Sequence, residues 1–114
     1  MAESSAAAIT VKDEGNSALG AKDFGCALRR YAAALAVCPL ADTTLRTVLH
    51  SNTAQGCLLA GNHVAAVAAA DRALGITPDH LKSHFRKVRA LLAQKEHKAA
   101  RAACDAALTF DSIM

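Results

Sequence analysis

Residues 50–74 read HSNTAQGCLLAGNHVAAVAAADRAL, and residues 84–108 read HFRKVRALLAQKEHKAARAACDAAL. The two stretches align without a gap at an offset of 34 residues. The matched pairs include His50 with His84, Asn52 with Arg86, Ala66 with Ala100, and Asp71 with Asp105. A fixed period of this length indicates stacked copies of one supersecondary unit, each too small to bury its apolar face alone.

An earlier copy of the unit precedes these two. Tyr31 aligns with Ala70 and Pro39 aligns with Pro78, both at an offset of 39. The five additional residues fit around residues 40–44, as a longer turn or an earlier helix start, because loop-closure entropy grows slowly with length. Helical periodicity and the Gly, Pro and Asn breaks predict six helices. They are expected at about residues 5–20, 23–37, 43–60, 63–76, 79–94 and 96–109.

Composition bounds the class of protein. A chain of 114 residues is long enough for one domain with its own core. The net charge of +3 comes from scattered Lys and Arg, and aromatic residues make up only 4%, so a nucleic-acid partner is not indicated. No secretory signal pattern and no bilayer-spanning apolar stretch is found in the sequence. We therefore expect a soluble, cytoplasmic protein with no membrane partner.

Small residues and prolines recur at fixed places in the three units, at Gly15, Ala27, Ala34 and Pro39, at Ala54, Ala66, Ala73 and Pro78, and at Ala100 and Ala107. This pattern resembles the tetratricopeptide repeat (TPR) family. The resemblance covers residues 6–112, with repeats at about 8–41, 47–80 and 81–114. It implies an all-α fold in which three helix-turn-helix repeats stack into a right-handed superhelix with a concave peptide groove.

Five polar residues fall on the predicted first helices of the three units: Lys12, Asn16, Asn52, Lys82 and Arg86. Lys12 and Asn16 are four positions apart, as are Lys82 and Arg86, so each pair shares a helix face. All five positions resemble the dicarboxylate clamp of cochaperone TPR domains. The resemblance implies a cochaperone adaptor that binds the C-terminal Glu-Glu-Val-Asp tail of heat-shock protein 90, heat-shock protein 70 or both.

The chemistry of these side chains suits such a ligand, because a C-terminal Asp presents a main-chain and a side-chain carboxylate close together. Lysines supply positive charge, Arg86 can donate two parallel hydrogen bonds, and the asparagines add neutral donors. By resemblance, we expect Lys12, Asn16 and Asn52 to hold the main-chain carboxylate. We expect Lys82 and Arg86 to hold mainly the Asp side chain.

Four more residues are expected at the periphery of the groove: Leu19, Gly20, Gln55 and Leu59. Gln55 and Leu59 lie about one and two turns beyond Asn52, and Leu19 and Gly20 lie comparably in the first unit. They should border the peptide residues that precede its C-terminus. TPR domains of this type discriminate between chaperone tails at such positions.

Two other interpretations of these residues stay open. Lys and Arg on helices are usually only solvated, and Gly15 with Asn16 could form a turn. The groove could also serve as a TPR scaffold for another acidic or internal peptide, recognised without a terminal carboxylate.

An enzyme is not expected. His80 and His84 are four apart, but they lack an H-E-x-x-H motif and an obvious third ligand. No Ser, Cys or His lies in a nucleophile motif. The four cysteines lack C-x-x-C spacing, so we expect small buried hydrophobes in a reducing compartment. We predict no metal, no cofactor and no catalytic residue.

The end of the sequence departs from the TPR pattern, because arrays usually finish with an additional helix that covers the last hairpin. Leu108, Phe110 and Ile113 are therefore expected to be partly exposed. An excised domain, a dimer or a folded-back tail would each account for this. We favour the first, which implies further domains of a longer parent protein.

Overall fold

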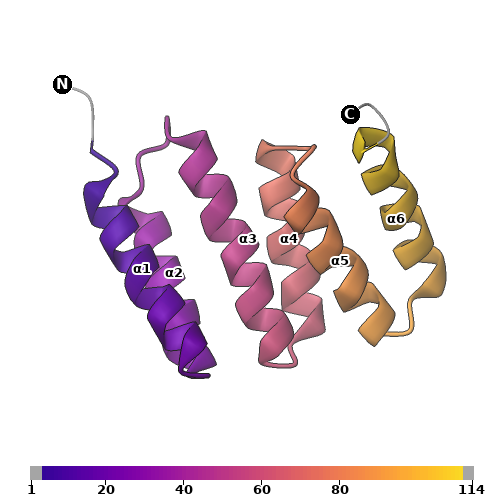
Figure 1. The fold of residues 1–114 in the computed structure, drawn as a ribbon, viewed down its shortest axis with the longest axis horizontal. Helices are drawn as coiled ribbons and strands as arrows, with labels where there is room; N and C mark the ends of the chain where they lie inside the picture. Colours follow the sequence, from indigo (N-terminus) through magenta and orange to yellow (C-terminus); the bar gives the residue numbers. More distant parts are fainter. Residues whose placement is uncertain (1–3, 112–114) are drawn as a thin grey trace.

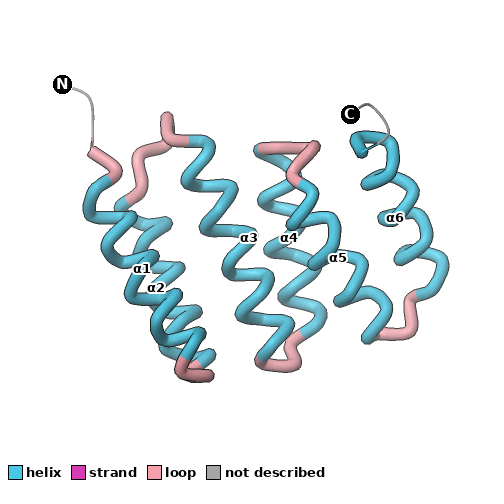
Figure 2. Tube along the Cα trace, in the orientation of Figure 1, coloured by secondary structure: helices cyan, strands magenta, loops and turns pink. Residues whose placement is uncertain are grey.

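The computed structural model describes residues 4–111, without the side chains of residues 110 and 111. Within that range, helices alternate with short turns and loops (Figure 2). The helices are α1 (Ala6–Gly20), α2 (Phe24–Val37), α3 (Thr43–Leu59), α4 (His63–Ile76), α5 (Leu81–Ala93) and α6 (His97–Asp111). The six predicted helices are all present, and each end lies within two residues of its predicted position. The predicted exposure of Phe110 and Ile113 lies outside the described side chains.

Local signals set where several of these helices begin. Asp23, Asp42 and Asn62 are the N-caps of α2, α3 and α4. Each side-chain oxygen accepts a hydrogen bond from the backbone N–H three residues later, at 3.1–3.2 Å. Such bonds satisfy donors that the first helical turn leaves unpaired, which fixes the start of the helix.

The turn inside each hairpin uses the same backbone conformation. Lys22, Gly61 and Lys95 all have positive φ angles, of 63°, 83° and 60°. They occupy equivalent positions in the three units, at offsets of 39 and 34 residues. Glycine adopts this conformation without strain, whereas lysine does so at a cost.

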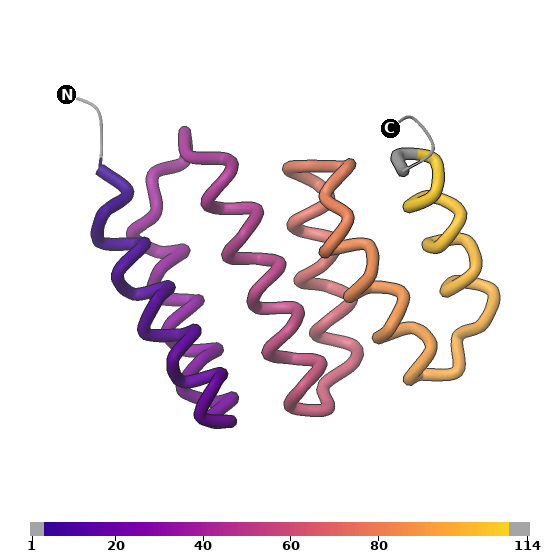
Figure 3. The backbone as a smooth tube through the Cα atoms, viewed as in Figure 1, coloured from indigo at the N-terminus to yellow at the C-terminus, as the bar shows by residue number. Residues whose placement is uncertain are grey.

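The three hairpins, α1/α2, α3/α4 and α5/α6, lie side by side in chain order, with the two ends of the chain at opposite ends of the molecule (Figures 1 and 3). The first helix of each unit also contacts the previous unit, since α3 packs on α2, and α5 packs on both α3 and α4. The result is an elongated body of 44 × 32 × 19 Å.

The five additional residues between the first two units mainly lengthen a helix. Helix α3 has 17 residues, whereas its counterpart α5 has 13. The connection before α3 is correspondingly only slightly longer than the one before α5. Of the two predicted possibilities, the earlier helix start is therefore the main outcome.

Small residues let the paired helices approach closely. Ala27, Ala34, Ala66 and Ala73 are completely buried at the hairpin interfaces. The closest approach is at Gly15 of α1, where a Cβ atom would lie 2.7 Å from a carbon of the Tyr31 ring on α2. Only glycine leaves room for the ring there. The Gly15–Asn16 pair lies within α1 and does not form a turn.

Candidate functional site

Asn16, on the second half of α1, lies at the centre of a polar cluster. Its side-chain oxygen accepts a hydrogen bond of 2.7 Å from the Tyr31 hydroxyl on α2. The side-chain nitrogen of Asn52, on α3, approaches the same oxygen at 3.5 Å, which is long for a hydrogen bond. The two predicted asparagines, 36 positions apart in sequence, are therefore neighbours.

Arg86 reaches this cluster from α5. Its Nη1 donates a hydrogen bond of 2.6 Å to the Ser51 hydroxyl, which is buried on α3 directly before Asn52. Burial lowers the pKa of Arg86 below its ordinary value, while the nearby Tyr31 hydroxyl acts in the opposite direction. Arginine remains charged under such a shift at neutral pH, because its ordinary value is so high.

Tyr31 links the two parts of the cluster. Its side chain is completely buried, and burial raises the pKa of its hydroxyl above 10.0, with the positive charge of Arg86 opposing the rise. The hydroxyl is therefore neutral at physiological pH. Asn16 and Arg86 thus both act on the buried Tyr31, and Asn52 approaches Asn16, so residues from the first helices of three different units lie in one cluster.

The two predicted lysines lie one helical turn before members of the cluster. Lys12 precedes Asn16 on α1, is partly buried, and has its amine 3.9 Å from the Asp13 carboxylate. Lys82 precedes Arg86 on α5 and is exposed. Within residues 4–111, neither Lys82 nor Arg86 forms an ion pair with a carboxylate. Their charges are therefore available to an anionic ligand.

Lys82 and Arg86 lie in the first two turns of α5, which begins at Leu81. Both positive charges lower the pKa of His80, although burial is the larger cause of that shift. His80 is the N-cap residue of α5 and shares a hydrogen bond of 2.7 Å with Ser83. A neutral imidazole therefore lies beside the two cations.

The predicted peripheral residues have different surroundings. Gln55 is partly buried, whereas Gly20 and Leu59 are exposed at the ends of α1 and α3. Leu19 packs against the core, and its Cδ1 lies 3.9 Å from where a Cβ of Gly56 would be. Much of the Leu19 side chain is therefore engaged in packing between α1 and α3.

Sequence reasoning missed two members of the cluster, Tyr31 and Ser51. The equivalents of Tyr31 in the other two units are Ala70 and Cys104. A tyrosine at a core position was the available signal, because a buried hydroxyl needs a hydrogen-bond partner. Ser51 gave only a weak signal, its position directly before Asn52.

Part of this chain is similar in sequence to curated proteins. No protein-family model matches the chain. The chain is 30% identical to the proteins named unc-45 homolog B of Xenopus laevis and Xenopus tropicalis over 83 residues. These matched residues make up 73% of this chain. The match spans 9% of the length of those curated relatives.

Three solved structures have closely similar folds. The TPR domain of Sgt2 from Aspergillus fumigatus has a TM-score of 0.81 at 25% identity, covering 92% of this chain and 66% of that one. The Hsp90 co-chaperone Cns1 from Saccharomyces cerevisiae has a TM-score of 0.82 at 28% identity, covering 88% of this chain and 32% of that one. The chain is a TPR domain. The first TPR of Spaghetti (RPAP3), bound to the HSP90 peptide SRMEEVD, shares the fold, with a TM-score of 0.80 at 18% identity, covering 92% of this chain and 81% of that one.

The cysteines of the TPR domain are only partly as predicted. All four are free, and Cys38 and Cys57 are buried. Cys26 is only partly buried and Cys104 is exposed, so the expectation of four buried cysteines is wrong. Cys104 lies on α6, the last described helix, and lines a surface depression together with residues of α5.

His84 of the TPR domain is held in place by burial and a hydrogen bond. His84 is buried and donates from Nε2 to the carbonyl oxygen of Pro78 at 2.8 Å. His84 therefore links α5 to the loop before it through this hydrogen bond. The described part of the chain contains no group of three or more His, Cys, Asp or Glu that could hold a metal ion. None of its helices is both long and apolar enough to span a membrane.

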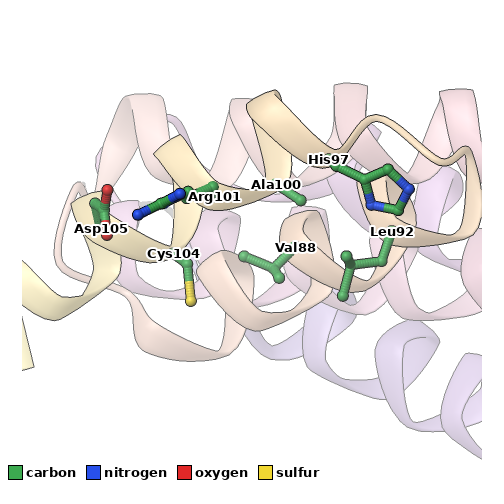
Figure 4. A pocket seen from close by; sticks show the side chains of 7 residues that line it. All are labelled: Val88, Leu92, His97, Ala100, Arg101, Cys104 and Asp105. Carbon is green, nitrogen blue, oxygen red and sulfur yellow. The ribbon is translucent and has the colours of Figure 1, made fainter.

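An open depression of about 300 Å³ lies between α5 and α6 (Figure 4). It is lined by Val88, Leu92, His97, Ala100, Arg101, Cys104 and Asp105. None of the five predicted site residues lines it. The depression and the polar cluster are therefore separate features.

Proposed function

We propose that this TPR domain binds the C-terminal Glu-Glu-Val-Asp tail of Hsp90, Hsp70 or both, through a dicarboxylate clamp. The proposed clamp consists of Lys12, Asn16, Asn52, Lys82 and Arg86. The observation that carries the proposal is the convergence of Asn16, Asn52 and Arg86 from three helices, with Arg86 unpaired by any described carboxylate. Charged and amide donors of this kind, with Lys82 and Arg86 unpaired by a described carboxylate, favour a carboxylate ligand.

Similar structures support the choice of ligand. Cns1 is an Hsp90 co-chaperone, and the first TPR of Spaghetti is bound to an HSP90 peptide that ends in Glu-Glu-Val-Asp. In the proposed complex, Lys12 and the two asparagines hold the main-chain carboxylate, and Lys82 and Arg86 hold the Asp side chain. The peripheral residues Leu19, Gly20, Gln55 and Leu59 border the preceding peptide residues.

The expected affinity is moderate. Each hydrogen bond to a charged group contributes roughly 1.5–3 kcal/mol, from which the ordering of a flexible tail must be subtracted. A net binding free energy of roughly 8 kcal/mol corresponds to a micromolar dissociation constant. In this proposal the domain is an adaptor in a cytoplasmic cochaperone, and any effector activity belongs to other domains of a parent protein.

The deciding experiment is calorimetric titration with peptides ending in Met-Glu-Glu-Val-Asp and in Ile-Glu-Glu-Val-Asp. Each peptide is compared with the same peptide amidated at its C-terminus. Binding that disappears on amidation supports the clamp, because amidation removes the terminal carboxylate. Equal binding of the amidated peptides points instead to a TPR scaffold for internal or acidic peptides.

Substitution of Arg86 tests the assignment of residues. Arg86→Ala should weaken binding at least about tenfold, which is roughly 1.4 kcal/mol. The matched control is Arg101→Ala, which removes the same charge from an exposed position on α6 and should leave binding unchanged. Equal affinities for the Arg86→Ala protein and the unsubstituted protein would show that the clamp is wrongly assigned.

A further inference from the structure

The orientation of the Asn16 side chain matters for the proposed clamp, because only its NH₂ group can donate to a carboxylate. An amide offers an oxygen on one side and a nitrogen on the other. If the oxygen faced the ligand, it would repel a carboxylate. Whatever fixes the orientation of Asn16 therefore sets whether this residue helps or hinders binding.

Two donors meet at the Asn16 oxygen. The Tyr31 hydroxyl donates to it at 2.7 Å, and the Asn52 NH₂ group approaches it at 3.5 Å. If the amide of Asn16 were reversed, its NH₂ would face the NH₂ of Asn52, and the Tyr31 hydroxyl would lose its acceptor. A buried hydroxyl left without an acceptor is unfavourable. The hydrogen bonds thus turn the Asn16 oxygen inward and its NH₂ outward.

Arg86 reinforces this orientation. Its guanidinium group is close enough to Tyr31 for each to shift the pKa of the other. A nearby positive charge attracts the lone pairs of the hydroxyl oxygen and repels its proton. The proton is therefore directed away from Arg86, in agreement with its donation to Asn16.

Gly15 makes the contact possible. A Cβ atom at this position would lie 2.7 and 2.9 Å from two carbons of the Tyr31 ring. Since real side chains do not come so close, any larger residue would displace the ring and its hydroxyl. The close approach of α1 and α2 thus brings a fully buried hydroxyl to the adjacent residue, Asn16.

We infer that Tyr31 is a positioning residue of the clamp: its hydroxyl orients the Asn16 amide so that the NH₂ group faces the bound carboxylate. Tyr31 itself is completely buried, so it acts through Asn16 and not by touching the peptide. This inference rests on the proposed clamp. Nothing in the repeat pattern requires it, since the equivalent residues are Ala70 and Cys104.

The test is a double-mutant cycle on peptide binding with Tyr31→Phe and Asn16→Ala. Tyr31→Phe keeps the ring and removes only the hydroxyl, and it should weaken binding about three- to tenfold. In the Asn16→Ala background the same substitution should have little further effect, because the residue through which Tyr31 acts is gone.

A matched control separates this role from general loss of a buried hydroxyl. Thr47 is buried on α3, and its hydroxyl bonds to the Thr77 hydroxyl at 2.7 Å and to the Thr43 carbonyl at 2.8 Å, not to Tyr31 or Asn16. Thr47→Val should lower stability without changing peptide affinity. Nuclear magnetic resonance of the Asn16 side-chain amide in the free protein provides a second readout, which Tyr31→Phe should shift and Thr47→Val should not.

Each outcome has a distinct meaning. If the unsubstituted protein binds and Tyr31→Phe binds equally well, the role of Tyr31 is overturned while the clamp stands. An undiminished effect of Tyr31→Phe in the Asn16→Ala background also overturns it, because the effect then does not pass through Asn16. If the unsubstituted protein binds neither peptide, the proposed function fails and this inference fails with it.

Discussion

The first and last hairpins place very different residues at the same repeat position. Tyr31 in the first hairpin is completely buried, whereas Cys104, its equivalent in the last, is exposed. The difference comes from the neighbouring unit, because Leu45 and Leu49 of α3 complete the core around Tyr31. No described element does the same for α6, and Leu108 on its surface is 56% exposed. A position in the repeat therefore predicts helix geometry, while its burial depends on what stacks against it.

The two hairpins should differ most in how much stability is lost when these equivalent side chains are truncated to alanine. Tyr31→Ala should lower the free energy of unfolding by about 3–5 kcal/mol, because it leaves a cavity in a closed core. Cys104→Ala should change it by less than about 0.5 kcal/mol, as is usual for exposed positions. Urea denaturation of the two variants measures both values. Similar losses would mean that the outer face of the last hairpin is covered in solution.

Close approach of helices provides the next contrast. Gly15→Ala should destabilise the domain by about 1–3 kcal/mol, because its methyl group would overlap the Tyr31 ring. The control is Gly75→Ala near the end of α4, where nothing lies within 4 Å of the new methyl group. That substitution should stabilise by up to about 1 kcal/mol through helix propensity. Thermal denaturation should separate them clearly, and stabilisation by both would refute the tight α1–α2 contact.

The positions of the helices could be predicted almost completely from the sequence. The 34-residue period fixed the number of helices, and residues such as Asn62 and Pro78 marked where they begin and end. These signals are local, so they do not depend on what packs against the helix. The exposure of Cys104 could not be predicted, because it depends on a contact between units and not on a local signal.

The candidate site was predictable in part. The sequence places the five clamp residues on the first helices of the units. The signals are the four-residue spacing within two helices and the shared repeat position of Asn52 and Arg86. The structure brings Asn16, Asn52 and Arg86 together, while their role in binding stays a prediction. The hydroxyl of Tyr31 was missed as a partner, since hydrogen bonds between helices have no sequence spacing of their own.

The turns inside the hairpins test whether local backbone strain is the same in the first and the last hairpin. Lys22 in the first hairpin and Lys95 in the last both have positive φ angles, of 63° and 60°. Lys22→Gly and Lys95→Gly should each stabilise by about 0.5 kcal/mol, because relief of the strained backbone exceeds the entropy cost of glycine. The gains should be equal, since the strain is local, and denaturation midpoints would show this. Gly61→Ala should lose about 1 kcal/mol at the equivalent position.

The smallest expected effect is the change of stability with pH, which comes from histidines on or next to α3 and α5. Burial is the main cause that lowers the pKa of His50 on α3 and of His80 before α5 below 6.5. The folded protein therefore binds fewer protons than the unfolded chain in this range. This contribution to stability is complete above about pH 6.5 and is lost as the pH falls through the lowered values. The urea midpoint should be lower at about pH 5.5 than at about pH 7.5.

Substitution of single histidines sharpens this last prediction. His50 is half-buried on α3, where the charges of Arg46 and Arg72 also lower its pKa, whereas His97 is exposed on α6. His50→Gln should reduce the difference between the two urea midpoints, because the neutral side chain no longer has to gain a proton on unfolding. His97→Gln, at an exposed position on α6, is the matched control. A midpoint that rises on acidification would contradict the assignment, because it would require groups that bind protons more tightly in the folded state.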